Sequence, residues 1–198
     1  MNRREAIRQT ALLMGYAVSA SAVAGVMAGC EVEQTDSWSP SYMSPLEARN
    51  LTELSERIVP RTTTPGAKDV GIHQFIDIML GEYLKEKEVV AFKAGLADLE
   101  KRSQSAHQKS FDSISDEEKD AIITELANEA EAKMKAMGPL NRDSKMPKDF
   151  FIMAKELSLL GYFSSEKVGI EVLDFLPVPG AYSGCIPLSE TKGVNWAI

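Results

Sequence analysis

The sequence predicts an all-α protein: a compact bundle of five to six helices with an extended, proline-rich C-terminal tail. Three observations support this prediction. Apolar residues recur at helical spacing in several segments of the 198-residue chain. Helix-capping signals flank these segments. No segment shows the sustained apolar–polar alternation of a half-buried strand, and no internal repeat occurs.

The first predicted helix begins after Ser44. The run Ser44-Pro45-Leu46-Glu47 combines an N-cap serine, a proline at the first helical position and a glutamate at the third. The helix should end before Pro60, because proline removes a backbone donor and restricts the residue before it. Its expected inward residues are Leu46, Leu51, Leu54 and Ile58.

The second predicted helix shows the clearest one-faced pattern in the chain. Its apolar residues follow the i, i+3, i+4, i+7, i+8 and i+11 spacing. They are Ile72, Phe75, Ile76, Met79, Leu80 and Tyr83. A third helix should span about 86–103, with one apolar stripe formed by Val89, Phe92, Leu96 and Leu99.

Three more helices complete the predicted bundle. A capping box at 115–118 opens the fourth, which should end before Gly138. Its expected inward residues are Ile122, Leu126 and Met134. The fifth should cover about 148–160 and end at Gly161, since glycine is the usual helix stop. A short sixth helix should cover 164–173, with its first residue as the cap.

The character of the sequence changes from residue 174 onward. Pro177, Pro179 and Pro187 disfavour regular helix and favour extended backbone. The same segment holds the apolar residues Phe175, Val178, Tyr182, Ile186, Leu188 and Trp196. A tail this apolar must lie along its own domain or along another protein. The expected organisation is an export signal at 1–30, a polar tether at 31–44, a helical domain at 45–173 and a partner-binding tail at 174–198.

The first thirty residues are typical of a bacterial export signal. Arg3 and Arg4 precede an uncharged, moderately apolar stretch that ends at Met27-Ala28-Gly29-Cys30. The arginine pair resembles the twin-arginine signal, which the translocase of that pathway reads to export folded proteins. The ending resembles a lipoprotein box, in which the Cys30 thiol is acylated and attaches the protein to a membrane in the periplasm. An uncleaved N-terminal anchor is the alternative.

Charge and cysteine content restrict the partners. The formal net charge is −7, and the signal holds three arginines against one glutamate, so the remaining chain is more acidic still. This balance argues against nucleic acid or an anionic membrane surface as a partner. With Cys30 lipidated, Cys185 would be single in an oxidising compartment. That indicates an intermolecular disulfide or a free thiol; a buried, inert thiol is the alternative.

The sequence lacks the motifs by which many enzymes hold cofactors. It has no Gly-x-Gly-x-x-Gly, no phosphate-binding loop and no Cys-x-x-Cys-His. Its two histidines have no metal-ligand partner at suitable spacing. We expect His73 at the edge of an apolar helix face and His107 in solvent. No catalytic, cofactor-binding or metal-binding residue is therefore expected in this chain.

Three segments carry a resemblance. The first is Ile-Val-Pro-Arg-Thr-Thr-Thr-Pro-Gly-Ala at 58–67, continuing to Asp77. The second, 150–166, ends in Leu-Gly-Tyr-Phe-Ser-Ser-Glu. The third is Pro-Val-Pro-Gly-Ala-Tyr-Ser-Gly-Cys-Ile-Pro-Leu at 177–188. In this order they resemble the signatures of the gluconate 2-dehydrogenase subunit 3 family, of which the twin-arginine leader is also a part.

The resemblance implies a small, non-catalytic subunit of a periplasmic dehydrogenase complex. In such complexes a large subunit of the glucose–methanol–choline type binds FAD and oxidises gluconate or a related sugar or polyol. A multihaem cytochrome c often takes the electrons onward. The large subunit commonly lacks an export signal and crosses the membrane as a passenger of the small one. A folded-export signal on a chain without a cofactor motif fits that role.

The resemblance also places candidate interface residues. They are Arg61, Thr63, Pro65, Tyr162, Phe163, Pro177, Pro179, Tyr182, Ile186 and Trp196. For the 60–66 loop the alternative is an ordinary helix connection, and for 160–163 it is core packing. Cys185 occupies the family's Tyr-x-Gly-Cys position, which makes it the candidate for a disulfide to the large subunit. Two other functions stay open: a lipid-anchored scaffold or binding protein without a dehydrogenase, and an enzyme with an unrecognised site.

Overall fold

The computed structural model describes residues 38–137, 148–176, 178, 180, 185–191 and 193–195. The chain divides into two units, Met1–Trp38 and Ser39–Ile198, and the helices described belong to the second. Its described part is helical and has no strand, which confirms the predicted fold class. The elements are α2 (Pro45–Ile58), η1 (Lys68–Val70), α3 (Ile72–Glu82), α4 (Glu86–His107), η2 (Phe111–Ser113), α5 (Asp116–Met137), α6 (Phe150–Phe163), α7 (Glu166–Glu171) and η3 (Leu188–Thr191).

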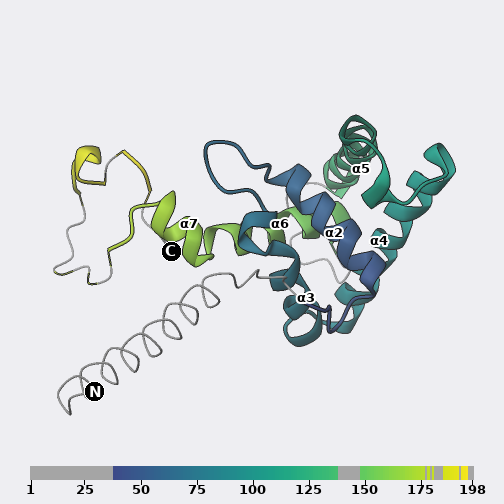
Figure 1. Ribbon diagram of the computed structural model, residues 1–198, viewed down its shortest axis with the longest axis horizontal. Coiled ribbons are helices and arrows are strands. Elements are labelled where there is room, and N and C mark those ends of the chain that lie inside the picture. Colours follow the sequence, from purple (N-terminus) through teal and green to yellow (C-terminus); the bar gives the residue numbers. More distant parts are fainter. Residues whose placement is uncertain are drawn as a thin grey trace, which may run out of the picture. The chain divides into compact units, whose positions relative to one another are not determined.

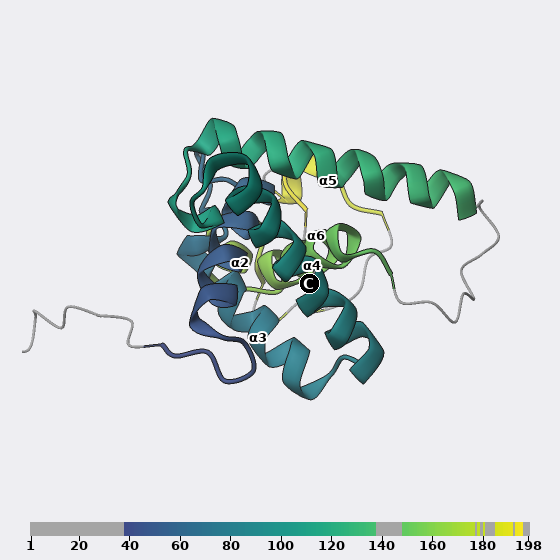
Figure 2. The same cartoon turned by 90° about the vertical axis from the view of Figure 1, so that its right-hand side faces the viewer.

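Helix α6 is the centre of the bundle. It packs against α2, α3, α4 and α5 (Figures 1 and 2), while α7 extends from its C-terminal end. A central helix needs apolar residues around most of its circumference, and the sequence of α6 is apolar over nearly its whole length. Phe150 begins the helix and meets Phe92 of α4 edge to face, with ring centroids 5.2 Å apart. No helix in the described ranges is long and apolar enough to cross a bilayer.

The predicted start of α2 is confirmed. Ser44 and Glu47 form the capping box: the Glu47 N–H donates to Ser44 Oγ at 3.3 Å, and the Ser44 N–H donates to Glu47 Oε2 at 2.7 Å. Leu51 and Leu54 are fully buried, as expected. Leu46 is exposed, so its predicted inward position is wrong. It lies in the first turn of α2, where Pro45 is exposed as well.

Two other inward predictions are wrong for similar reasons. Tyr83 is 72% exposed. Helical spacing would place it on the inner face, but α3 ends at Glu82, so Tyr83 lies just outside the helix and does not follow that spacing. Met134 is 56% exposed because the last turns of α5 extend past the neighbouring helices (Figure 2), where residues 131–136 are all exposed. Periodicity alone could not show where the neighbouring helices end.

The end of α6 also differs from the prediction. Gly161 does not stop the helix, which continues to Phe163. The glycine serves close packing instead: a Cβ atom at this position would lie 2.7 Å from Cδ1 of Phe75 on α3. The cap of the next helix is Ser165 rather than Ser164, since Ser165 Oγ accepts the N–H of Val168.

Gly95 of α4 allows a second close approach. A Cβ atom here would lie 2.0 Å from Cγ and 2.4 Å from Cβ of Phe150. These atoms are next to the backbone of α6, so the ring cannot rotate out of the way. Gly95→Ala should therefore lower the free energy of unfolding by about 2 kcal/mol, although alanine is the better helix former by roughly 1 kcal/mol. Urea unfolding followed by circular dichroism measures the change.

Gly81→Ala is the matched control for this prediction. Gly81 also lies in a helix, but its neighbour is the ring of Tyr42, which is 40% exposed and can shift toward solvent at the cost of its hydrogen bond to Glu82. The loss should be smaller than at Gly95. Equal stability of the Gly95→Ala protein and the wild type would contradict the packing argument.

The residues just before α2 are fixed to α3. We call residues 41–43 the strap. The Asp77 carboxylate, which is 1% exposed, accepts the backbone N–H groups of Ser41 at 2.7 Å, Tyr42 at 3.1 Å and Met43 at 2.9 Å. Lys93 of α4 donates to the Tyr42 carbonyl at 2.6 Å. A buried carboxylate persists only when its oxygens are hydrogen-bonded, and here the strap supplies the donors.

Candidate functional site

The loop between α2 and α3 is built as a rigid turn. We call residues 61–65 the threonine loop. Glu56 of α2 accepts the backbone N–H of Arg61 at 3.0 Å and that of Lys68 at 2.8 Å. Asp69 of η1 accepts the Gly66 N–H at 2.8 Å. Carboxylates from the elements on each side therefore hold the backbone of the loop.

Gly66 is required by this arrangement. A Cβ atom at this position would lie 2.5 Å from Glu56 Oε1 and 2.7 Å from the Arg61 nitrogen. Within the loop, the Thr62 N–H donates to the Thr64 carbonyl at 3.1 Å. The threonine loop thus has a fixed shape and presents exposed side chains, including those of Arg61 and Thr63.

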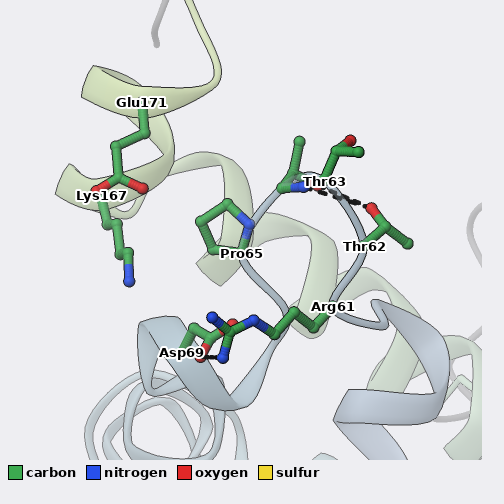
Figure 3. A pocket seen from close by; sticks show the side chains of 8 residues that line it. Arg61, Thr62, Thr63, Pro65, Asp69, Lys167 and Glu171 are labelled. Atoms are coloured by element: carbon green, nitrogen blue, oxygen red, sulfur yellow. Dashed lines mark hydrogen bonds and ion pairs between the residues drawn. The ribbon is translucent and has the colours of Figure 1, made fainter.

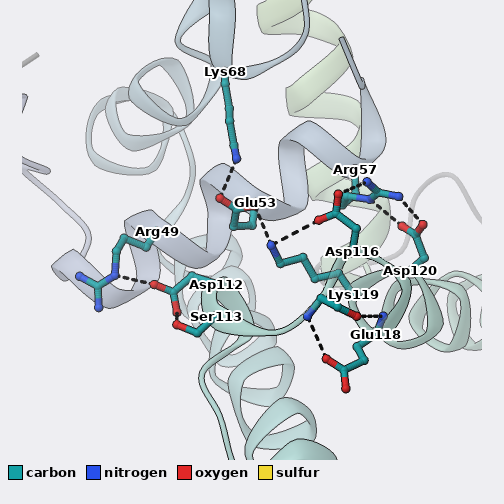
Figure 4. A network of polar contacts seen from close by, with 11 residues as sticks. Arg49, Glu53, Arg57, Lys68, Asp112, Ser113, Asp116, Glu118, Lys119 and Asp120 are labelled. Carbon is teal, nitrogen blue, oxygen red and sulfur yellow. Dashed lines mark hydrogen bonds and ion pairs between the residues drawn. The ribbon is translucent and has the colours of Figure 1, made fainter. Parts of the chain in front are cut away.

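An ion-pair network fixes η1, which follows the loop (Figure 4). Glu53 of α2 accepts Lys68 Nζ at 2.7 Å and Lys119 Nζ of α5 at 2.9 Å. Burial opposes ionisation of Glu53, but the hydrogen bonds from Lys68 and Lys119 outweigh it and hold the pKa of this carboxyl below its ordinary value. The Lys119 side chain is only 6% exposed, so Glu53 supplies the counter-charge that it needs. The network ties α2, η1 and α5 together behind the loop.

The second resemblance segment meets the first at this loop. The Tyr162 hydroxyl donates to the Pro65 carbonyl at 2.9 Å, and the Tyr162 side chain is buried. Phe163 is 40% exposed and packs edge to face on Tyr162, with centroids 5.3 Å apart. Of these two candidate interface residues, Tyr162 is thus a core residue that supports the loop, whereas Phe163 reaches the surface.

A shallow pocket of about 180 Å³ lies between the threonine loop and α7 (Figure 3). It is lined by Arg61, Thr62, Thr63, Thr64, Pro65, Asp69, Lys167 and Glu171. Within it Arg61 Nη1 lies 3.3 Å from Asp69 Oδ1, and α7 contributes one charge of each sign. This lining can hydrogen-bond a polar side chain. Sequence reasoning missed Lys167 and Glu171, because only tertiary packing brings α7 to the loop.

The histidines do not add to this pocket. His107 was expected in solvent, but its Nδ1 lies 3.0 Å from Glu118 Oε1 and its side chain is 25% exposed. The reason is that the last turn of α4 meets the first turn of α5. The hydrogen bond from the Ser115 N–H lowers the pKa of Glu118 below its ordinary value. Across the described residues, no three His, Cys, Asp or Glu side chains are grouped to hold a metal ion.

A backbone hydrogen bond joins the start of the C-terminal tail to a residue near its end. The Asp174 N–H donates to the Asn195 carbonyl at 2.8 Å, which brings together the two ends of the segment 174–195. Among its described residues the tail forms one 3₁₀ turn, η3. Ile186 is half-buried and Cys185 is exposed, so the alternative of a buried thiol is wrong. The remaining candidates lie outside the described residues: Pro177, Pro179, Tyr182, Trp196, Arg3, Arg4 and Cys30.

The matched residues identify the chain. A family model described as gluconate 2-dehydrogenase subunit 3 matches residues 45–180. The chain belongs to this family. The matched range of this gluconate 2-dehydrogenase subunit 3 protein includes all helices from α2 to α7, the threonine loop and the start of the tail. Searches of curated proteins and of solved structures gave no significant match.

Membership in the gluconate 2-dehydrogenase subunit 3 family makes the chain an accessory subunit of a dehydrogenase complex. Two of the three segments that carry the resemblance meet in the structure, through Tyr162 and Pro65 and through Gly161 and Phe75. The site therefore presents a rigid loop, a polar pocket and an exposed aromatic ring. This combination is suited to binding another protein surface.

Proposed function

We propose that this chain is the non-catalytic small subunit of a periplasmic, FAD-dependent dehydrogenase of the glucose–methanol–choline type. The complex oxidises gluconate or a related sugar or polyol. FAD is held by the large subunit, and haem c by a cytochrome subunit where one is present. The family match over residues 45–180 carries this proposal.

The chain has three tasks in the proposed complex: export, attachment to a membrane and binding of the large subunit. Arg3 and Arg4 direct export by the twin-arginine route, and the large subunit crosses with this chain. Cys30 is lipidated and holds the complex at a membrane facing the periplasm. The helical domain stabilises the large subunit by binding it, since a ligand that binds only the folded state shifts the folding equilibrium.

The threonine loop supports the binding task. Its shape is set before any partner arrives, by Glu56, Asp69 and Gly66. A preformed loop loses little conformational entropy on docking, so more of its contact energy appears as affinity. In the proposed complex Arg61 and Thr63 contact the large subunit, and Pro65 positions them.

Cys185 is proposed to form a disulfide with the large subunit. It is exposed, and it lies in a closed segment that carries several exposed apolar residues. An exposed thiol in an oxidising compartment is available for an intermolecular bridge.

A mild-detergent pull-down of the full-length protein from membranes tests the proposal. We expect a large second chain whose absorption spectrum shows bound flavin, and which oxidises sugars or sugar acids. A non-reducing gel of the same sample should show a reductant-sensitive heterodimer that Cys185→Ser abolishes. A colourless, solitary small protein would favour the lipid-anchored scaffold instead.

A further inference from the structure

Exposed apolar side chains are concentrated in one stretch of the domain. Most large hydrophobic residues of α2–α5 face the core, whereas a run from the end of α6 into the tail does not. We call this run the α6–tail surface. Its members are Leu159, Leu160, Phe163, Ile170, Phe175, Leu176 and Val178, each at least 37% exposed. Monomeric proteins seldom leave such a group uncovered, so it indicates a binding surface.

Helix α6 contributes an apolar cluster at the C-terminal end of its outer side. The inner side, which includes Leu157 and Gly161, packs into the bundle. On the outer side the exposed charged residues Lys155 and Glu156 come first. The exposed Leu159, Leu160 and Phe163 follow them, and their i, i+1 and i+4 spacing groups them on that side. This cluster lacks a partner within the described part of the domain, and an uncovered apolar cluster indicates a binding surface.

The tail repeats this pattern. Phe175 is 52% exposed, Leu176 47% and Val178 79%. The bond from Asp174 to Asn195 holds the two ends of the segment together, yet η3 takes no part in the main packing contacts among the described elements. The described part of the domain thus leaves about half of the Phe175 and Leu176 surface and most of the Val178 surface uncovered, so another protein can cover them. The tail follows α7 in the chain, and Figure 1 shows its described part at the α7 end of the domain.

The polar pocket and this surface share helix α7. Lys167 and Glu171 line the pocket beside the threonine loop, and Ile170 is exposed on the same short helix. An apolar centre with a polar, hydrogen-bonding border is the usual composition of a stable protein–protein interface. An anionic lipid surface is a poor fit for this site, because the chain has a net negative charge and the border carries charges of both signs.

We propose that the α6–tail surface is the docking surface for the large flavoprotein subunit, with the threonine loop at its border. This inference rests on the proposed function, and it adds Leu159, Leu160, Ile170, Phe175 and Leu176 to the interface. The occupant follows from the family match, which describes a subunit of a dehydrogenase and runs to residue 180, through the whole surface. Leu160 and Ile170 are the central anchors, since each is more than half exposed on a fixed helix.

The test compares three full-length proteins in the mild-detergent pull-down: wild type, Leu160→Asp/Ile170→Asp and Val90→Asp. Val90 is 63% exposed on α4, away from the proposed surface, and is the matched control. The double variant should recover at least about tenfold less flavin per small subunit, as expected for loss of interface hot spots. Val90→Asp should recover as much as wild type. Circular dichroism should show equal helix content in all three.

A further variant excludes an effect on folding. Phe175→Asp/Leu176→Asp changes only residues that follow α7, so the bundle stays intact, and it should also lose flavin. Full flavin recovery by both double variants would overturn the docking surface while leaving the proposed function in place. A wild-type protein that recovers no flavin would instead contradict the proposed function. A further outcome is that the double variants keep the flavoprotein and lose a dimer that the wild-type chain forms with itself. That result would assign the surface to self-association and would also overturn the inference.

Discussion

Replacing Asp77 by alanine should lower the free energy of unfolding by about 3 kcal/mol. The carboxylate accepts three backbone N–H groups of the strap in a site that is 1% exposed. Alanine removes both acceptor oxygens, and with them all three hydrogen bonds, and leaves the Met43 N–H buried without a partner. The strap should then detach from α3, and the packing of Tyr42 over Gly81 should be lost with it.

Chemical unfolding and hydrogen exchange measure this effect together. The midpoint of urea unfolding should fall, and the amides of Ser41, Tyr42 and Met43 should lose protection before the rest of the domain. Asp77→Asn keeps the size of the side chain and one acceptor oxygen, so it should lie between wild type and Asp77→Ala. Glu125→Ala, at an exposed position of α5, is the control and should change stability by less than about 0.5 kcal/mol. An Asp77→Ala protein as stable as this control would contradict the role of the strap.

Changing Arg3 and Arg4 together to lysine should leave both this chain and its flavoprotein partner in the cytoplasm. The expected effect is a nearly complete loss of periplasmic dehydrogenase activity, because the proposed partner travels only with this chain. Lysine keeps the charge but lacks the planar guanidinium, so the change tests recognition of the arginine pair rather than charge. Cell fractionation with immunoblots for both chains measures it.

Arg8→Lys is the matched control for the export prediction. Arg8 lies in the same segment but outside the adjacent pair. Both chains should reach the periplasm in this variant. Export of the flavoprotein in the Arg3→Lys/Arg4→Lys strain would show that it has its own route, and the passenger role would be abandoned.

The start of α2 could be predicted because it depends on neighbours in sequence. The Ser44–Glu47 capping box needs only four residues in a row, and it forms as predicted. The wrong predictions have a different origin. Gly161 has the local properties of a helix stop, but contact with Phe75 on another helix decides its role. Tyr83 continues the apolar spacing of α3, but the helix ends one residue earlier.

The candidate site shows the same division. The threonine loop could be named in advance because its sequence is distinctive and carries the resemblance. Its support by Glu56 and Tyr162, and the place of Lys167 in the pocket, depend on packing between helices and could not be read from spacing. The sequence around Asp77 does contain one indication of its role. Asp77 is a charged residue between two isoleucines in a largely apolar helix. Such a residue is either buried with partners or placed at the surface, and the sequence alone does not decide between them.

The strap also determines how the domain responds to mechanical force. A pull along the N-terminal segment would reach the three hydrogen bonds at Asp77 before it reached the first turn of α2. These bonds lie between the strap and a different helix, so the load passes to α3 and, through Phe75 and Gly161, to the central helix α6. Tension from an anchor would therefore be spread into the core and would not unravel the bundle from its end.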